Sequence, residues 1–227
     1  MPQNWHAFTA EEHRVWDLLF ARQQERLAGR AVRAFMEGLD LLRLSRPGIP
    51  NLAELNRTLK ARTGWPRPGR RLLPSPQRTP LYRRQLHRRA DQLDYLEEPD
   101  VFHDLFGHVP LLADPRMADF MVTLGRLGLR ARAEGTLERL ARLYWHTVEF
   151  GLAWEDGALK IYGAGIASSF GETAYALESA EPDRPAFDVA HAMATPYRSD
   201  TLQERYFVVD DLSALLAVTE GDLERLL

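Results

Sequence analysis

TLERLARLYWHTVEFGL, residues 136–152, is the stretch that decides the fold class. Its apolar residues recur with the period of an α-helix, so they form one face that must be buried. The residues of this face are Leu137, Leu140, Ala141, Tyr144, Trp145 and Val148. We therefore expect a helix over about residues 136–152, packed inside a core.

Amphipathic patterns upstream of this stretch predict three more helices. Residues 9–29, TAEEHRVWDLLFARQQERLAG, open with a capping threonine and acidic residues in the first turn. Two further helices are expected over residues 31–44 and 51–61, with Pro47 and Gly48 separating them.

The downstream sequence predicts little β-structure. LKIYGAGIASS, residues 159–169, is typical of a short strand followed by a tight turn. Helices are expected around residues 185–193 and 212–227. The predicted fold class is therefore mainly α, an α+β arrangement with few short strands.

Bulk properties of the 227-residue chain exclude several classes of function. One domain is the default at this length, and a net charge of -3 gives no general field for nucleic acid or a membrane surface. The absence of cysteine excludes disulfides, thiol nucleophiles and iron–sulfur clusters, so any metal must bind to His, Asp or Glu. With no leader-like N-terminus and no long apolar run, we expect a cytoplasmic protein without a membrane partner.

A basic, irregular segment lies between Glu54 and Asp91, which enclose no acidic residue. Five prolines between residues 66 and 80 exclude a continuous helix there. Because the segment lacks regular aromatic interleaving, we interpret it as a solvated loop with some ligand contacts rather than as a nucleic-acid surface.

Two histidines, His103 and His108, lie five positions apart in PDVFHDLFGHVPLL, residues 99–112. On an ideal α-helix this spacing turns them away from a common face, so convergence on a metal needs a distorted or terminated helix. Gly107 and Pro110 are suited to such a break. Taken alone, the pair is equally compatible with a metal site and with buried structural histidines.

Glu149 is the third candidate ligand, because it lies beside the apolar face of residues 136–152. A buried carboxylate needs compensation by an arginine or a cation. Two imidazoles and one carboxylate are typical of non-haem iron(II) sites with open positions, and the same set can hold catalytic zinc.

Several motifs resemble segments of the pterin-dependent aromatic amino acid hydroxylases, with the bacterial single-domain phenylalanine 4-hydroxylases as the nearest members. They are PDVFHDLFGHVPLL, LARLYWHTVEFGL at 140–152 and YGAGIASSFGE at 162–172, and the similarity extends from the N-terminal helices to YRSDTLQERYFVVD at 197–210, which is nearly the whole chain. The resemblance implies one catalytic domain over residues 1–227 without a regulatory domain. It also implies Fe(II), a tetrahydropterin and O2, with hydroxylation of an aromatic amino acid. Phenylalanine to tyrosine is the first expectation, while tryptophan, tyrosine or another ring carbon stay open, as does the oligomeric state.

The resemblance also assigns roles to residues. The implied iron ligands and catalytic residues are His103, His108 and Glu149. The implied substrate-binding residues are Arg88, which would grip the substrate carboxylate, Asp100, which would position Arg88, and Pro99, Trp145, Gly165 and Ser168 in the pocket wall. The implied residues of the iron and pterin cleft are Asp104, Tyr144 and Glu172.

One segment departs from the family pattern. Between Trp65 and Arg88 the chain is shorter than usual and lacks the paired phenylalanines of the element that holds the pterin. This departure leaves open a pterin-independent or altered-specificity hydroxylase, in which Tyr82 could replace the lost ring, or Arg83 and Arg84 could admit an anionic cosubstrate. A zinc hydrolase and an inactive metal-binding relative are the remaining alternatives.

Overall fold

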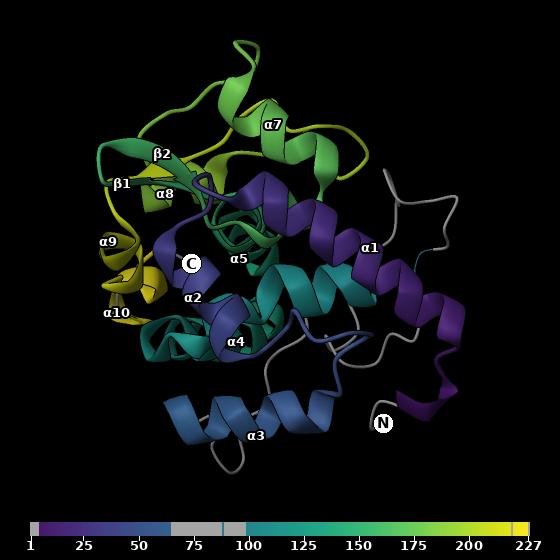
Figure 1. Ribbon diagram of the computed structural model, residues 1–227. Helices are drawn as coiled ribbons and strands as arrows, with labels where there is room; N and C mark the ends of the chain where they lie inside the picture. Colours follow the sequence, from purple (N-terminus) through teal and green to yellow (C-terminus); the bar gives the residue numbers. More distant parts are fainter. Residues whose placement is uncertain (1–4, 65–87, 89–98, 219, 227) are drawn as a thin grey trace.

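The computed structural model describes residues 5–64, 88, 99–218 and 220–226 (Figure 1). The helices before the predicted metal site are η1 (Trp5–Ala7), α1 (Ala10–Leu27), α2 (Arg33–Leu41) and α3 (Leu52–Thr63). The middle of the chain forms η3 (His103–His108), η4 (Pro110–Ala113), α4 (Pro115–Glu134), α5 (Leu137–Tyr144) and η5 (Trp145–Glu149). The remaining helices are α6 (Ala164–Ser168), α7 (Phe170–Glu178), α8 (Val189–Ala194), α9 (Leu212–Leu216) and α10 (Glu220–Glu224).

The three predicted N-terminal helices are confirmed. Thr9 caps α1, because its side chain accepts from the backbone N–H of Glu12 while the Glu12 carboxylate accepts from the Thr9 backbone N–H. Asn51 caps α3, which ends at Gly64 in the left-handed conformation. Figure 1 shows α1 as a long helix running past α7, and α3 set apart at the lower edge.

The longest helix of the described residues, α4, is absent from the sequence-based prediction. Its end signals are nonetheless present, since Asp114 caps it, Pro115 occupies its first turn and Gly135 ends it with a positive φ. The prediction around residues 185–193 is confirmed only for the short α8. The helix expected over 212–227 is two short helices, α9 and α10.

The second half of the chain contains a small three-stranded sheet. Strands β1 (Leu152–Glu155), β2 (Ala158–Ile161) and β3 (Val208–Val209) lie in the order β2-β1-β3. β1 and β2 form an antiparallel hairpin around Asp156 and Gly157, both with positive φ, whereas β3 pairs with β1 in parallel. The Asp-Gly pair is a hairpin signal in the sequence, and this hairpin is absent from the sequence-based prediction.

The stretch that decides the fold class is buried as expected, but it is not one helix. α5 ends at Tyr144, the π-helix η5 follows, and the chain enters β1 at Leu152. α5 packs against α4 and α8 in the interior, as Figure 1 shows. The mainly α fold class with few short strands is confirmed. Among the described residues, no helix is both long and apolar enough to cross a membrane.

Candidate metal centre

His103 and His108 converge because they occupy the two ends of the π-helix η3. The hydrogen bonds of a π-helix join residues five apart, so residues with this spacing lie one turn apart on the same side. Their Nε2 atoms are 3.1 Å apart. The predicted helix distortion is therefore confirmed, but Gly107 does not end the helix. Pro110 begins the next short helix, η4.

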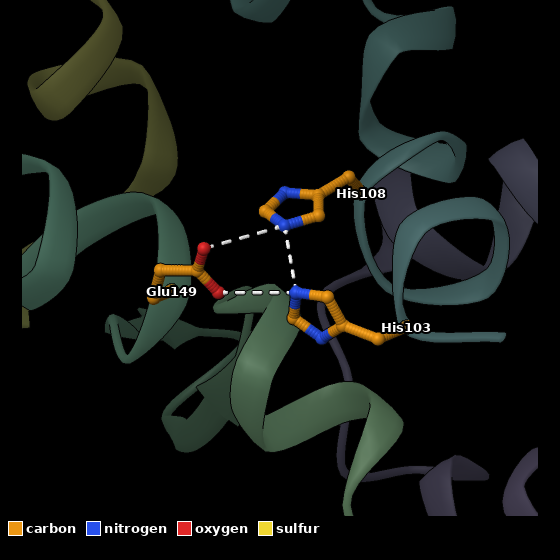
Figure 2. A group of neighbouring side chains, drawn as sticks. All are labelled: His103, His108 and Glu149. Carbon is orange, nitrogen blue, oxygen red and sulfur yellow. Dashed lines mark hydrogen bonds and ion pairs between the residues drawn. The ribbon is translucent and has the colours of Figure 1, made fainter. Parts of the chain in front are cut away.

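Glu149 is the last residue of the second π-helix, η5, and its side chain is 8% exposed. Its Oε1 lies 3.4 Å from His108 Nε2 and its Oε2 lies 3.6 Å from His103 Nε2. Figure 2 shows the carboxylate facing both imidazole rings across a common space. The carboxylate faces these two imidazoles, which is the arrangement that the cation alternative requires.

The three side chains, here named the ligand cluster, fit a metal ion. Their ligand atoms lie within 4.8 Å of one another. Ligands at right angles on a metal, each bound at about 2.1 Å, lie roughly 3 Å apart, close to the spacing of these atoms. Two imidazole nitrogens and one carboxylate also form the donor set of non-haem iron(II) sites.

Ser168 selects the tautomer of His103. The Ser168 hydroxyl donates to the carbonyl oxygen of Ala164 at 2.8 Å, and the same hydroxyl lies 2.9 Å from His103 Nδ1. With its proton committed, the hydroxyl accepts from Nδ1–H. This bond leaves a lone pair on Nε2, directed at the ligand cluster, as a metal ligand requires.

Glycines let helix α6 approach both π-helices. A Cβ atom on Gly163 would lie 2.5 Å from the carbonyl oxygen of Glu149, and one on Gly165 would lie 2.7 Å from the ring of Phe150. A Cβ on Gly107 would lie 2.8 Å from the carbonyl oxygen of Ala164. The predicted tight turn at residues 165–169 is wrong, because these residues mostly belong to α6. The GAG element serves close packing behind the metal site.

Asp100 connects Arg88 to the ligand cluster. Its buried carboxylate accepts from Arg88 Nε at 3.0 Å and from Arg88 Nη2 at 3.1 Å, which is a bidentate pair. It also accepts from the backbone N–H of His103 at 3.0 Å. Arg88 lies over the ring of Phe102 as well, and Pro99, directly before Asp100, is partly buried. The expectation that Asp100 positions Arg88 agrees with this geometry.

Trp145, at the start of η5, belongs to a group of neighbouring rings that we name the aromatic wall: Trp145, Phe150 and Tyr197. The ring of Trp145 stacks on Tyr197 with a centroid distance of 4.2 Å, and its Nε1–H donates to Gln203 Oε1 at 2.8 Å. Phe150, directly after η5, has its ring centroid 4.8 Å from that of Trp145, at a tilted angle. Residues distant in sequence therefore fix the ring that the sequence analysis placed in the pocket.

The three residues expected in the iron and pterin cleft lie in different settings. Asp104 is buried next to His103 in η3, and the ring of Tyr144 lies 6.4 Å from the ring of His108. The Glu172 carboxylate accepts from the Tyr206 hydroxyl and from the backbone N–H of Gln203. Burial raises the pKa of Glu172. Within the described ranges, Glu172 makes no hydrogen bond or ion pair with the ligand cluster, and its place in the cleft stays a prediction.

Sequence reasoning missed the contribution of residues 195–207. Tyr197 and Gln203 hold Trp145, and His146 Nε2 donates to the carbonyl oxygen of Thr195 at 3.1 Å. The similarity of residues 197–210 to the family was the one available signal. The segment between Trp65 and Arg88, with Tyr82, Arg83 and Arg84, lies outside the described residues.

These features define a candidate metal centre of the two-histidine, one-carboxylate type in a mainly helical fold. Known proteins carry the assignment further. The sequence profile of the biopterin-dependent aromatic amino acid hydroxylases matches residues 4–219. A phenylalanine-4-hydroxylase of Ralstonia nicotianae is 47% identical over 234 residues, which cover 98% of this chain and 73% of that protein.

Two crystal structures of phenylalanine hydroxylase from Chromobacterium violaceum are also similar, each with a TM-score of 0.87. One contains iron(III) and oxidised 7,8-dihydrobiopterin; it is 44% identical, and the match covers 100% of this chain and 84% of that chain. The other contains iron and phenylalanine, with 42% identity and coverage of 100% and 85%. The chain belongs to the biopterin-dependent aromatic amino acid hydroxylases, a family of enzymes.

Proposed function

We propose that this enzyme is a non-haem iron(II) monooxygenase that hydroxylates the ring of an aromatic amino acid with O2 and a tetrahydropterin. Phenylalanine is the proposed substrate and tyrosine the product. The observation that carries the proposal is the geometry of His103, His108 and Glu149, whose ligand atoms face one another in a buried space inside a fold of this family.

His103, His108 and Glu149 are the proposed iron ligands. When bound, iron(II) supplies the redox chemistry that activates dioxygen. The protein holds three donors on one side, which leaves the other side for the reactants. The Ser168 hydroxyl keeps the proton of His103 on Nδ1, and the close approach of α6 fixes the position of Glu149. These contacts support a rigid ligand set.

Arg88 and the aromatic wall are proposed to bind the amino acid. A guanidinium already paired with Asp100 has further N–H groups with which to bind a carboxylate. Trp145 offers an apolar ring surface near Glu149. Pro99, Gly165 and Ser168 are proposed as the other residues of the amino acid pocket. Asp100 also accepts from the backbone N–H of His103. Asp100 therefore holds both Arg88, the proposed substrate-binding residue, and one end of the ligand cluster.

A tetrahydropterin is the proposed reductant, with Asp104, Tyr144 and Glu172 proposed at its cleft. Asp104 and Tyr144 adjoin the histidine ligands, which supports them more strongly than Glu172. The shortened segment between Trp65 and Arg88 keeps a pterin-independent or altered-specificity reaction as the second candidate. We expect weaker pterin binding than in family members with the longer segment.

The test is mass spectrometry of the products after iron-loaded protein is incubated with phenylalanine, tyrosine and tryptophan together, with and without tetrahydropterin. Tyrosine formed from labelled phenylalanine, only with the pterin, supports the proposal. Hydroxylation without pterin moves the enzyme to another cosubstrate class. The absence of any hydroxylated product refutes the proposed activity.

Family membership favours iron oxygenation over the zinc hydrolase and the inactive relative that the ligand set alone allows. Metal analysis with oxygen uptake separates these alternatives, since a hydrolytic zinc enzyme consumes no oxygen. The single catalytic domain and the cytoplasmic location stay predictions.

A further inference from the structure

A small apolar cavity lies behind the proposed metal centre. It is lined by residues of η3, η4, α4, η5 and α6 and by Tyr162, so both π-helices that carry the ligand cluster contribute to its wall. Its volume is about 10 Å³, counted as the space open to the centre of a water-sized sphere. This volume is enough for one very small molecule. The cavity therefore suits an occupant of two or three atoms.

The lining of the cavity is almost wholly apolar. Of its nine residues, only His108 and Tyr162 carry polar side-chain atoms. The others include the buried side chains of Leu111, Leu112, Met117, Met121 and Val148. A buried water is stable with two to four polar partners, and apolar cavities without them stay dry. Only His108 and Tyr162 could be polar partners of a water, which is the lower limit, whereas the other seven residues of the lining favour a small apolar molecule.

His108 belongs both to the ligand cluster and to the lining of this cavity. Its Nε2 lies 3.4 Å from Glu149 Oε1 in the ligand cluster. Val148, also in the lining, directly precedes Glu149 in η5. A molecule held in the cavity therefore lies next to a residue that carries a proposed metal ligand.

We propose that this cavity binds dioxygen and holds it beside the metal centre. Dioxygen is a small apolar diatomic that makes weak hydrogen bonds, so it partitions into apolar space. The polarisable sulfurs of Met117 and Met121 add favourable dispersion contacts. The assignment of dioxygen as a substrate rests on the proposed function, whereas binding of the gas in the cavity does not require turnover.

The five methionines of the chain provide the test. The protein is labelled with ¹³C at the methionine methyl groups and loaded with zinc as a diamagnetic stand-in. Dissolved dioxygen is paramagnetic, so it accelerates the relaxation of nearby nuclei. We expect several-fold larger acceleration at Met117 and Met121, which line the cavity, than at Met193, which is fully buried elsewhere. Equal acceleration at the three methyl groups overturns the proposal.

Filling the cavity gives a second measurement. In Met121→Phe, a larger ring occupies the space, so the relaxation of Met117 should fall to the level of Met193. In the iron-loaded enzyme the KM for dioxygen should rise several-fold, with unchanged KM values for amino acid and pterin. The matched control is Met36→Phe, at a half-buried site on α2 outside the cavity lining.

The two experiments separate the cavity from the proposed function. Selective relaxation at Met117 and Met121 without any hydroxylation supports the cavity and refutes the activity. Hydroxylation without selective relaxation refutes the cavity and leaves the activity standing. An unchanged KM for dioxygen in Met121→Phe overturns the role of the cavity in oxygen supply.

Discussion

The ligand cluster and the aromatic wall each have one residue in η5, Glu149 and Trp145, yet the two groups are held in place differently. Two of the three cluster residues belong to the six-residue helix η3, and the third ends η5. Trp145 is instead held by Gln203, 58 positions away, and by stacking on Tyr197. Backbone geometry fixes the cluster, whereas side chains of a distant segment fix the wall. Loss of a cluster residue should therefore abolish activity, and changes in the wall should have graded effects.

The largest expected effect is from His108→Ala and Glu149→Ala. Removal of a residue that only supports a ligand already costs about 10–100-fold in metal affinity or activity, so loss of the ligand itself should abolish turnover. Iron content by mass spectrometry and product formation by chromatography measure this, while circular dichroism checks folding. His6→Ala, at an exposed histidine, is the control. Near-normal hydroxylation by either variant would falsify the iron site.

Arg88→Lys should raise the KM for the amino acid with unchanged iron content. An ammonium cannot reproduce the planar fork that pairs with Asp100, and hydrogen bonds to charged groups contribute about 1.5–3 kcal/mol, or about 10–100-fold. Steady-state kinetics at saturating oxygen measure the effect. The control is Arg225→Lys, at an exposed arginine directly after α10. Kinetics like those of the parent would place Arg88 outside the substrate site.

Gly163→Ala tests whether the backbone fixes the cluster. Its Cβ would meet the carbonyl oxygen of Glu149 and the backbone nitrogen of Gly151, so α6 or η5 must shift. Overpacking of this kind costs about 1–3 kcal/mol, and we expect a lower Tm together with weaker iron binding. Gly171→Ala is the matched control, because nothing lies within 4 Å of its Cβ. Equal Tm values for the two variants would contradict the close-approach argument.

The contrast also explains what the sequence could predict. The residue types of His103, His108 and Glu149 made them candidate ligands, but their spacing left buried structural histidines equally possible, and the family resemblance assigned the ligand roles. The π-helix η5 was not predictable, since the periodicity of residues 136–152 is the same whether the last turn is α or π. The roles of Tyr197 and Gln203 depend on packing between distant segments, which no local pattern encodes. α4 was missed although Asp114, Pro115 and Gly135 mark its ends.

Tyr197→Ala probes the aromatic wall. Loss of a stacked ring removes about 0.5–1.5 kcal/mol beyond its buried area, so Trp145 should be less firmly held. We expect a KM for the amino acid that rises by roughly 2–10-fold, with unchanged iron content. Tyr197→Phe keeps the ring and should behave like the parent. If Tyr197→Ala instead loses iron, the wall and the cluster are not independent.

The smallest expected effect is on stability against pH, through His146. Burial lowers the pKa of His146 from 6.5 to about 4. Its Nε2 donates to Thr195, and its Nδ1 has no hydrogen-bond partner among the described residues. The unfolded chain therefore binds a proton at a higher pH than the folded one. The stability contributed by the neutral ring is fully present above pH 6.5 and is lost as the pH falls toward 4.

At pH 5.5 this loss amounts to roughly 1 kcal/mol, because the unfolded histidine is then about nine-tenths protonated while the folded ring is still neutral. The measurement is urea unfolding of the parent and of His146→Gln at pH 7.5 and pH 5.5. Glutamine does not titrate, so the difference between the two proteins isolates His146 from Glu172 and the other acids. The parent should lose about 1 kcal/mol more of its free energy of unfolding than the variant over this interval.

Since His146 donates to Thr195, which begins the segment that carries Tyr197 and Gln203, the same acidification should raise the KM for the amino acid before iron is released. Simultaneous loss of iron and substrate affinity would contradict the separation of wall and cluster.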